Sequence, residues 1–213
     1  MNFLTDNIIV KGGIVMVPII LGSIIALTIA IERGVKFWRI KLDIEKFSER
    51  IFDLLNRGEL NYALEICKDT AHPAGKIFAA GIKNKDLKRE EVERLMEREG
   101  GLEIVSLEKN MNYLMLTAGV EPMLGFLGTI IGLIRAFMVW EQYSTSITVD
   151  KLAAGIYQAM ITTAGGLIVA IPSYIIYHIY LNYINRTAGQ LNDYGEKLLQ
   201  HIADSKKLTD AES

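Results

Sequence analysis

Two threonines, Thr129 and Thr163, lie near the middle of two apolar runs, residues 122–139 and 152–181. At about 1.5 Å per helical residue, each run is long enough to cross a bilayer core of about 30 Å. A span that only anchors a protein needs bulky apolar side chains, whereas a hydroxyl offers a hydrogen-bonding group to a passing proton or water. These two runs therefore favour conduction or coupling over simple anchoring.

Small residues share a helical face with each threonine, at about 100° per residue. On the second span this face holds Ala118, Pro122, Gly125, Thr129, Gly132 and Ala136, and on the third it holds Ala159, Thr163, Gly166 and Ala170. Small faces let helix backbones approach closely. Two interpretations stay open at this point: ordinary close packing with each threonine bonded to its own helix backbone, or the wall of a conducting path.

Other polar groups in these spans need partners or water. Gln158 and Thr162 lie on a second stripe of the third span. Two interpretations of these side chains remain: hydrogen bonding between helices, or contact with a pore. Glu121 is expected at the cytoplasmic rim of the second span, where it either marks the interface or forms an acidic passage for cations. Pro122 and Pro172 each remove one backbone hydrogen bond, which kinks a helix or is simply tolerated in a membrane.

The middle of spans two and three contains no aspartate or glutamate. A proton path through these spans would therefore need a carboxylate supplied by another polypeptide. Arg135 lies close enough to Trp140 for its side chain to reach the outer membrane interface.

Composition excludes several other classes of function. The formal net charge of −2 argues against a nucleic-acid partner. The single cysteine, Cys67, excludes an internal disulfide and a cysteine-rich metal site. The spans hold no Ser/His, Asp/Asp or His-rich constellation. We therefore expect no enzyme activity, no metal and no cofactor.

The elements that position these residues are three transmembrane helices. The first apolar run, Gly13 to Ile31, has 19 uncharged residues and ends in Glu32-Arg33 rather than at a small-residue cleavage site, so we expect a retained helix. Basic residues follow the first and third spans, whereas the loop between spans two and three has only Lys151. The positive-inside rule then predicts an N-terminus outside and a C-terminus inside. The fold class is an all-α integral membrane protein in which helices 2 and 3 extend into a cytoplasmic helical domain.

The expected organisation follows in chain order. It is a periplasmic segment (1–12), transmembrane helix 1 (13–32), a cytoplasmic helical domain (33–110), transmembrane helix 2 (111–140), a periplasmic loop (141–151), transmembrane helix 3 (152–184), and a cytoplasmic C-terminal helix and tail (185–213).

The cytoplasmic domain shows helical periodicity rather than linker composition. Amphipathic stretches cover residues 44–55 and 60–67, and a third begins at Pro73, a residue suited to a first helical turn. No proline occurs between Pro73 and Pro122, so we expect one helix from Asp86 to Trp140. The alternative is two helices hinged at Gly100-Gly101. The polar end after Lys206 is expected to be disordered.

Two stretches carry a resemblance to a known family. EPMLGFLGTIIGLIRAF (121–137) and GIYQAMITTAGGLIVAIPSYIIYH (155–178) resemble the signature spans of the MotA/TolQ/ExbB proton-channel family, most closely its ExbB/TolQ branch. The stretch ALEICKDTAHPAGKIFAAGIKN (63–84) is also similar to that branch, and so is the three-span, N-out layout. The resemblance covers roughly residues 8–200.

The resemblance implies a pentamer whose second and third spans surround transmembrane helices of an ExbD/TolR-like single-span partner dimer. Protons would pass under the proton-motive force, relayed by an aspartate of the partner, and Thr129 and Thr163 match the pore-lining threonines of such proteins. The location implied is the bacterial inner membrane. Two residues depart from the family pattern: Gln158 stands where many members have glutamate, and Glu121 stands where most have a small residue.

The leading hypothesis is therefore a proton-channel stator subunit of an energy-transducing motor. The alternative, from another class, is a non-conducting membrane scaffold that organises a partner through its long cytoplasmic helices. In the scaffold, apolar replacements of the threonines would be harmless.

Overall fold

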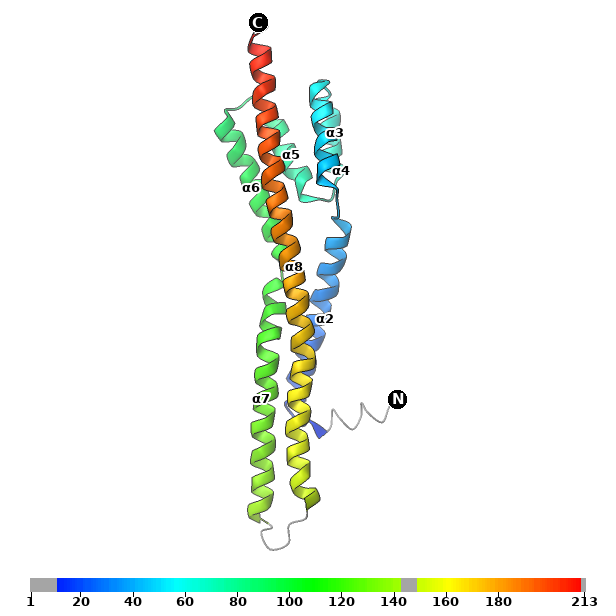
Figure 1. The fold of residues 1–213 in the computed structure, drawn as a ribbon, viewed down its shortest axis with the longest axis vertical. Coiled ribbons are helices and arrows are strands. Elements are labelled where there is room, and N and C mark those ends of the chain that lie inside the picture. The colour runs from blue at the N-terminus through cyan, green and yellow to red at the C-terminus, as the bar shows by residue number, and fades with distance from the viewer. Residues whose placement is uncertain (1–10, 143–148, 212–213) are drawn as a thin grey trace. The chain divides into compact units, whose positions relative to one another are not determined.

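The computed structural model describes residues 11–142 and 149–211, with side chains for residues 11–142 and 153–205. Every regular element in this part of the chain is an α-helix (Figure 1). The helices are α2 (Met16–Arg39), α3 (Ile44–Asn56), α4 (Leu60–Asp69), α5 (Pro73–Lys83), α6 (Arg89–Glu108), α7 (Met111–Gln142) and α8 (Val149–Ala211). The predicted all-α class is confirmed.

Three stretches are long and apolar enough to cross a membrane by length and composition: Met16–Arg39, Arg89–Gln142 counted through the turn between α6 and α7, and Ala153–Ser205. The chain divides into two compact units. The first comprises Met1–Glu32 and Asn110–Ile179, and the second comprises Arg33–Lys109 and Tyr180–Ser213. Helices α2 and α8 each contribute residues to both units.

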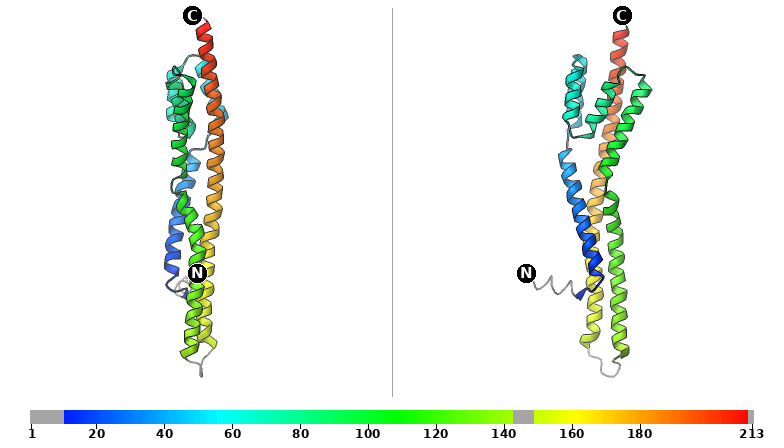
Figure 2. Two further views of the ribbon diagram at one scale, coloured as in Figure 1. Left: turned by 90° about the vertical axis from the view of Figure 1, so that its left-hand side faces the viewer. Right: turned by 180° about the vertical axis from the view of Figure 1, so that it is seen from behind.

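In the first unit, α7 and the first part of α8 lie side by side with opposite chain directions, and α2 packs against both (Figures 1 and 2). Val15, Met16 and Ile19 are buried where α2 begins, against Leu124 and Ile131 of α7 and Ile161 and Val169 of α8. Most other large apolar side chains of these helices remain exposed in the single chain. Such surfaces suit contact with lipid or with other membrane helices.

The second unit has its own apolar core, built from one face of each short helix and from the end of α8. Ile51, Ala63, Phe78 and Leu198 are each 0% exposed. The amphipathic stretches predicted at 44–55, at 60–67 and from Pro73 are all confirmed as helices. Asp43 caps α3 by accepting a hydrogen bond from the Lys46 backbone N–H, at 3.3 Å.

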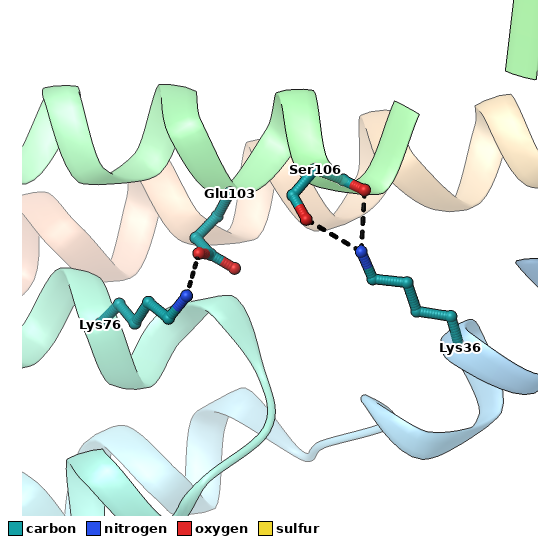
Figure 3. Close-up of polar contacts among 4 residues, drawn as sticks. All are labelled: Lys36, Lys76, Glu103 and Ser106. Atoms are coloured by element: carbon teal, nitrogen blue, oxygen red, sulfur yellow. Dashed lines mark hydrogen bonds and ion pairs between the residues drawn. The ribbon is translucent and has the colours of Figure 1, made fainter. Parts of the chain in front are cut away.

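Polar contacts in the second unit involve the C-terminal half of α6 (Figure 3). Lys36 Nζ donates to the carbonyl oxygen of Ser106 at 2.8 Å and to its hydroxyl at 2.9 Å. Arg33 donates to the same carbonyl at 3.3 Å. Two cations thus meet the Ser106 carbonyl in the last turn of α6, where the helix dipole favours positive charge. Nearer the middle of α6, Lys76 of α5 pairs with Glu103.

The continuous helix expected from Asp86 to Trp140 is wrong. Gly100-Gly101 lies inside α6, and the interruption falls at Lys109-Asn110 instead. Asn110 adopts a φ of 65°, a left-handed conformation that asparagine tolerates better than most residues. The expected disorder after Lys206 is also wrong for the backbone, because α8 runs to Ala211.

A buried histidine gives the second unit a pH dependence. His72 caps α5, since its Nδ1 accepts a hydrogen bond from the Ala74 N–H at 3.1 Å. Burial lowers the pKa of His72 to about 4. Between pH 6.5 and 4 the unfolded chain therefore binds more protons than the folded chain, so the free energy of unfolding falls as the pH falls. We expect a loss of about 2–3 kcal/mol across this window.

Cys67 can report the unfolding of the second unit, because its side chain is 2% exposed and belongs to the apolar core of that unit. A dithiodipyridine reagent, which reacts with thiols even in acid, measures how fast the Cys67 thiol is modified in the full-length protein. The ratio of this rate to the rate in an unfolded peptide gives the protection of the thiol. His72→Asn keeps a capping acceptor without the titrating ring. In His72→Asn, the protection of the Cys67 thiol should therefore fall less steeply as the pH is lowered from 6.5 to 4. If protection depends on pH equally in the variant and the wild type, His72 is not the group responsible.

Candidate functional site

Helices α7 and α8 meet through glycine, with almost no side chain between the backbones. A Cβ atom placed on Gly132 would lie 2.7 Å from the carbonyl oxygen of Gly155 and 2.9 Å from the Cβ of Ala159. A Cβ on Gly125 would lie 3.0 Å from the carbonyl oxygen of Thr162. Contacts this short leave no room for a larger residue on α7.

The contact is reciprocal on α8. A Cβ on Gly155 would lie 2.8 Å from both the Cβ of Ala136 and the carbonyl oxygen of Gly132. A Cβ on Gly166 would overlap the Glu121 carbonyl oxygen and lie 3.2 Å from the Cα of Gly125. Gly125, Gly132 and Gly166 thus hold the closest part of the seam between α7 and α8, which is the geometry of small-residue membrane packing.

Pro122 and Pro172 lie inside α7 and α8 respectively, and neither ends its helix. Both are at least partly exposed.

Thr163 lies on this seam and remains partly exposed. Its hydroxyl donates to the carbonyl oxygen of Gly125 on α7 at 3.2 Å and lies 3.4 Å from that of Ala159 on its own helix. Thr129 is also partly exposed and donates to the carbonyl oxygen of Phe126 at 2.6 Å. Both hydroxyls therefore have a backbone acceptor, and neither side chain is enclosed within the single chain.

Thr162 occupies a different environment from its neighbour. It is 0% exposed, and a Cβ on Gly128 would overlap its hydroxyl oxygen. The hydroxyl donates to the carbonyl oxygen of Ala159 at 2.9 Å. Thr162 thus fills the space that Gly128 leaves, inside the α7–α8 contact.

Gln158 finds its partner on α7. Its Oε1 accepts a hydrogen bond from Arg135 Nη1 at 2.9 Å, and the side chain is 7% exposed. A Cβ on Gly13, whose φ is +70°, would lie 2.5 Å from Gln158 Nε2. The chain before α2 therefore passes directly over this amide, and Arg135 turns back to the amide although its own side chain is exposed.

Glu121 is buried rather than at a rim of the single chain. It is 2% exposed, and its Oε2 has no hydrogen-bond partner among the residues that the structure describes. A Cβ on Gly22 of α2 would overlap its Oε1. An interface marker would keep its carboxylate in water, so this interpretation does not fit the side chain.

Sequence reasoning missed Gly128, Gly155 and Gly22 as contact residues. For Gly128 the signal was available, because Gly125, Gly128 and Gly132 form a GxxGxxxG pattern. Gly22 lies nine residues from the nearest other glycine and carried no such signal. Among the described residues no group of three metal-ligating side chains occurs.

A sequence profile of the MotA/TolQ/ExbB proton channel family matches residues 69–193, which include both threonines and the whole seam. The chain belongs to this family. The resemblance of the two signature spans is thereby confirmed, as is the ExbB/TolQ branch. The family is one of membrane proteins associated with proton channels and biopolymer transport.

Relatives within the family come from several organisms. A putative biopolymer transport protein ExbB-like 1 of Synechocystis is 32% identical over 175 residues, 81% of this chain and 68% of the relative. The Tol-Pal system protein TolQ of Haemophilus influenzae is 29% identical, over 96% of this chain and 94% of its own. The biopolymer transport protein ExbB of Salmonella typhimurium is 25% identical, over 91% and 81% respectively.

Proposed function

We propose that this ExbB/TolQ-family chain is the pentameric proton-channel stator subunit of a motor driven by the proton-motive force, working with an ExbD/TolR-like partner dimer. Family membership and the three apolar helices support a multi-pass protein of the bacterial inner membrane. A proton crossing a membrane potential of 100 mV releases about 2.3 kcal/mol, so several protons would drive a sizeable conformational step.

One observation carries the proposal: Thr129 and Thr163 are partly exposed beside a seam that is otherwise closed by glycine. Each hydroxyl donates to a backbone carbonyl, and its oxygen can still accept a hydrogen bond from a water or a passing proton on the exposed side. We assign these two threonines to the wall of the proton pore. The titrating carboxylate in the pore would come from the partner.

The remaining candidates take supporting places in this proposal. Gln158, Thr162 and Glu121 are buried within the single chain. We assign them to positions behind the pore wall, where they fix the helices that carry the threonines. Gly125, Gly132 and Gly166 set the distance between those helices, and Pro122 and Pro172 shape them.

The proposed orientation is N-out and C-in. It rests on the basic residues after the first and third spans, which the positive-inside rule assigns to the cytoplasm. Residues 33–110 and 185–213 would then be cytoplasmic, and residues 1–12 and 141–151 periplasmic.

Reconstitution tests the function as a whole. Vesicles that contain the chain together with its single-span partner should take up protons when a potassium gradient sets an inside-negative potential. The chain alone should give the background rate, because the relay carboxylate is missing. Native mass spectrometry of the complex should count five copies of the chain. Equal uptake with and without the partner would contradict the shared pore.

A non-conducting scaffold remains the second candidate because of α6. Leu102 and Val105 on this helix are 56% and 66% exposed, and such side chains suit contact with a partner. In a scaffold, a charge at Val105 would abolish function while threonine variants kept it. The opposite pattern is expected for the pore.

A further inference from the structure

Glu121 has only a supporting place behind the proposed pore wall, yet its surroundings are unusual for a carboxylate. It is 2% exposed, and Oε2 is buried without a hydrogen-bond partner in the described part of the chain. Its Oε1 lies so close to Gly22 that a Cβ there would overlap it, and its backbone carbonyl is covered by Gly166. Three helices, α2, α7 and α8, therefore enclose this residue.

The stretches of α2, α7 and α8 around Glu121 contain no second charged residue to compensate it. Apart from Glu121 itself, residues 12–31, 114–134 and 158–173 contain no titratable group. The nearest titratable groups along the three segments are Lys11, Glu32, Tyr113, Arg135, Tyr157 and Tyr174. Arg135 lies fourteen residues further along α7, about 21 Å away along the helix axis, and donates to Gln158 instead.

The neutral hydroxyl donors nearby already donate to backbone carbonyl oxygens. One turn before Glu121, the Thr117 hydroxyl donates to the Tyr113 carbonyl oxygen at 2.9 Å. Next to Gly22, the Ser23 hydroxyl donates to the Ile20 carbonyl oxygen at 2.7 Å. Among the described residues, Oε2 of Glu121 therefore receives neither a cation nor the hydrogen bonds that usually stabilise a buried carboxylate.

A buried, unpaired carboxylate has two ways to lose its charge: it binds a metal ion or it binds a proton. A metal ion needs several ligands, and no group of three ligating side chains occurs among the described residues. A proton needs only the one carboxylate. The enclosure therefore selects the proton.

We propose that Glu121 is a proton-binding site inside each protomer, and that its proton is retained while Gly22 of α2 is seated against it. The site is separate from Thr129 and Thr163, since it is closed by α2 within one chain. It does not require the partner and is independent of whether the threonines line a pore. Movement of α2 away from α7 would admit water and release the proton.

Infrared spectroscopy of the purified full-length protein at pH 7 tests the site without any transport assay. The spectrum of the wild type minus that of Glu121→Gln should show the carbonyl band of one protonated carboxyl group. The matched control is Glu141→Gln, which removes an exposed glutamate from the same helix. Its difference spectrum should show ionised carboxylate bands only.

Two further measurements address the enclosure. Dicyclohexylcarbodiimide, which reacts with protonated carboxyl groups in apolar surroundings, should label the Glu121 peptide at pH 7 and leave Glu141 unlabelled. Gly22→Ala adds a Cβ where Oε1 now lies, so it should displace the carboxyl group and reduce the protonated band by at least half. A carboxylate band for Glu121 at pH 7 in the wild type would overturn the proposal, even if vesicles containing the complex conduct protons. Loss of conduction with an intact protonated band would count only against the pore.

Discussion

Thr163→Val is expected to slow proton uptake by the reconstituted complex about 10- to 100-fold while leaving its assembly intact. Valine has nearly the shape of threonine but lacks the hydroxyl, which now donates to the Gly125 carbonyl oxygen across the seam. If that hydroxyl also serves the passing proton, its loss raises the barrier by about 1.5–3 kcal/mol, which slows conduction by about 10- to 100-fold. Thr129→Val should behave in the same way.

Two control variants separate conduction from packing. Thr163→Ser keeps the hydroxyl and should conduct at close to the normal rate. Thr162→Val makes the same chemical change one residue away, at a side chain that is 0% exposed inside the α7–α8 contact. It should leave the rate within about twofold, because its hydroxyl is enclosed and out of reach of a path along the exposed side of the seam. Full uptake in both Thr163→Val and Thr129→Val would remove the threonines from the pore.

Gly132→Leu is expected to prevent the folded protein from accumulating. A single Cβ at this position would already lie 2.7 Å from a carbonyl oxygen and 2.9 Å from the Ala159 backbone nitrogen, neither of which moves as a flexible side chain does. Even Gly132→Ala must force α7 and α8 apart, and we expect a cost of about 1–3 kcal/mol, as for other overpacked cores. The thermal midpoint of the detergent-solubilised protein, followed by size-exclusion chromatography, measures both variants.

Gly119 supplies the matched control on the same helix. It is exposed, and a Cβ there meets no atom within 4 Å. Gly119→Ala should be neutral or should stabilise α7 by up to about 1 kcal/mol, because alanine is the better helix former. If Gly132→Ala and Gly119→Ala shift the midpoint equally, helix propensity alone explains the result and the close seam does not limit stability.

Much of the fold follows from local signals in the sequence. Apolar runs almost free of charge predicted the three long helices, and the periodicity of residues 44–82 predicted α3, α4 and α5. Pro73 marked the start of α5 because a proline suits a first helical turn. The break between α6 and α7 was not predicted, because the low helix propensity of glycine pointed to Gly100-Gly101 as the weak position. Glycine is tolerated inside a helix, whereas the left-handed turn at Asn110 leaves only a weak trace in the sequence.

The sequence by itself determined the residue types of the seam and the family, because small residues and threonines at helical spacing are a property of the chain. Only the tertiary structure decided which of them face inward. Thr162 and Thr163 are adjacent, yet one is enclosed and the other partly exposed. Glu121 was expected at an interface and is enclosed by Gly22, a residue 99 positions earlier. Burial depends on which helices pack together, and helical spacing within one span carries no information about its neighbours.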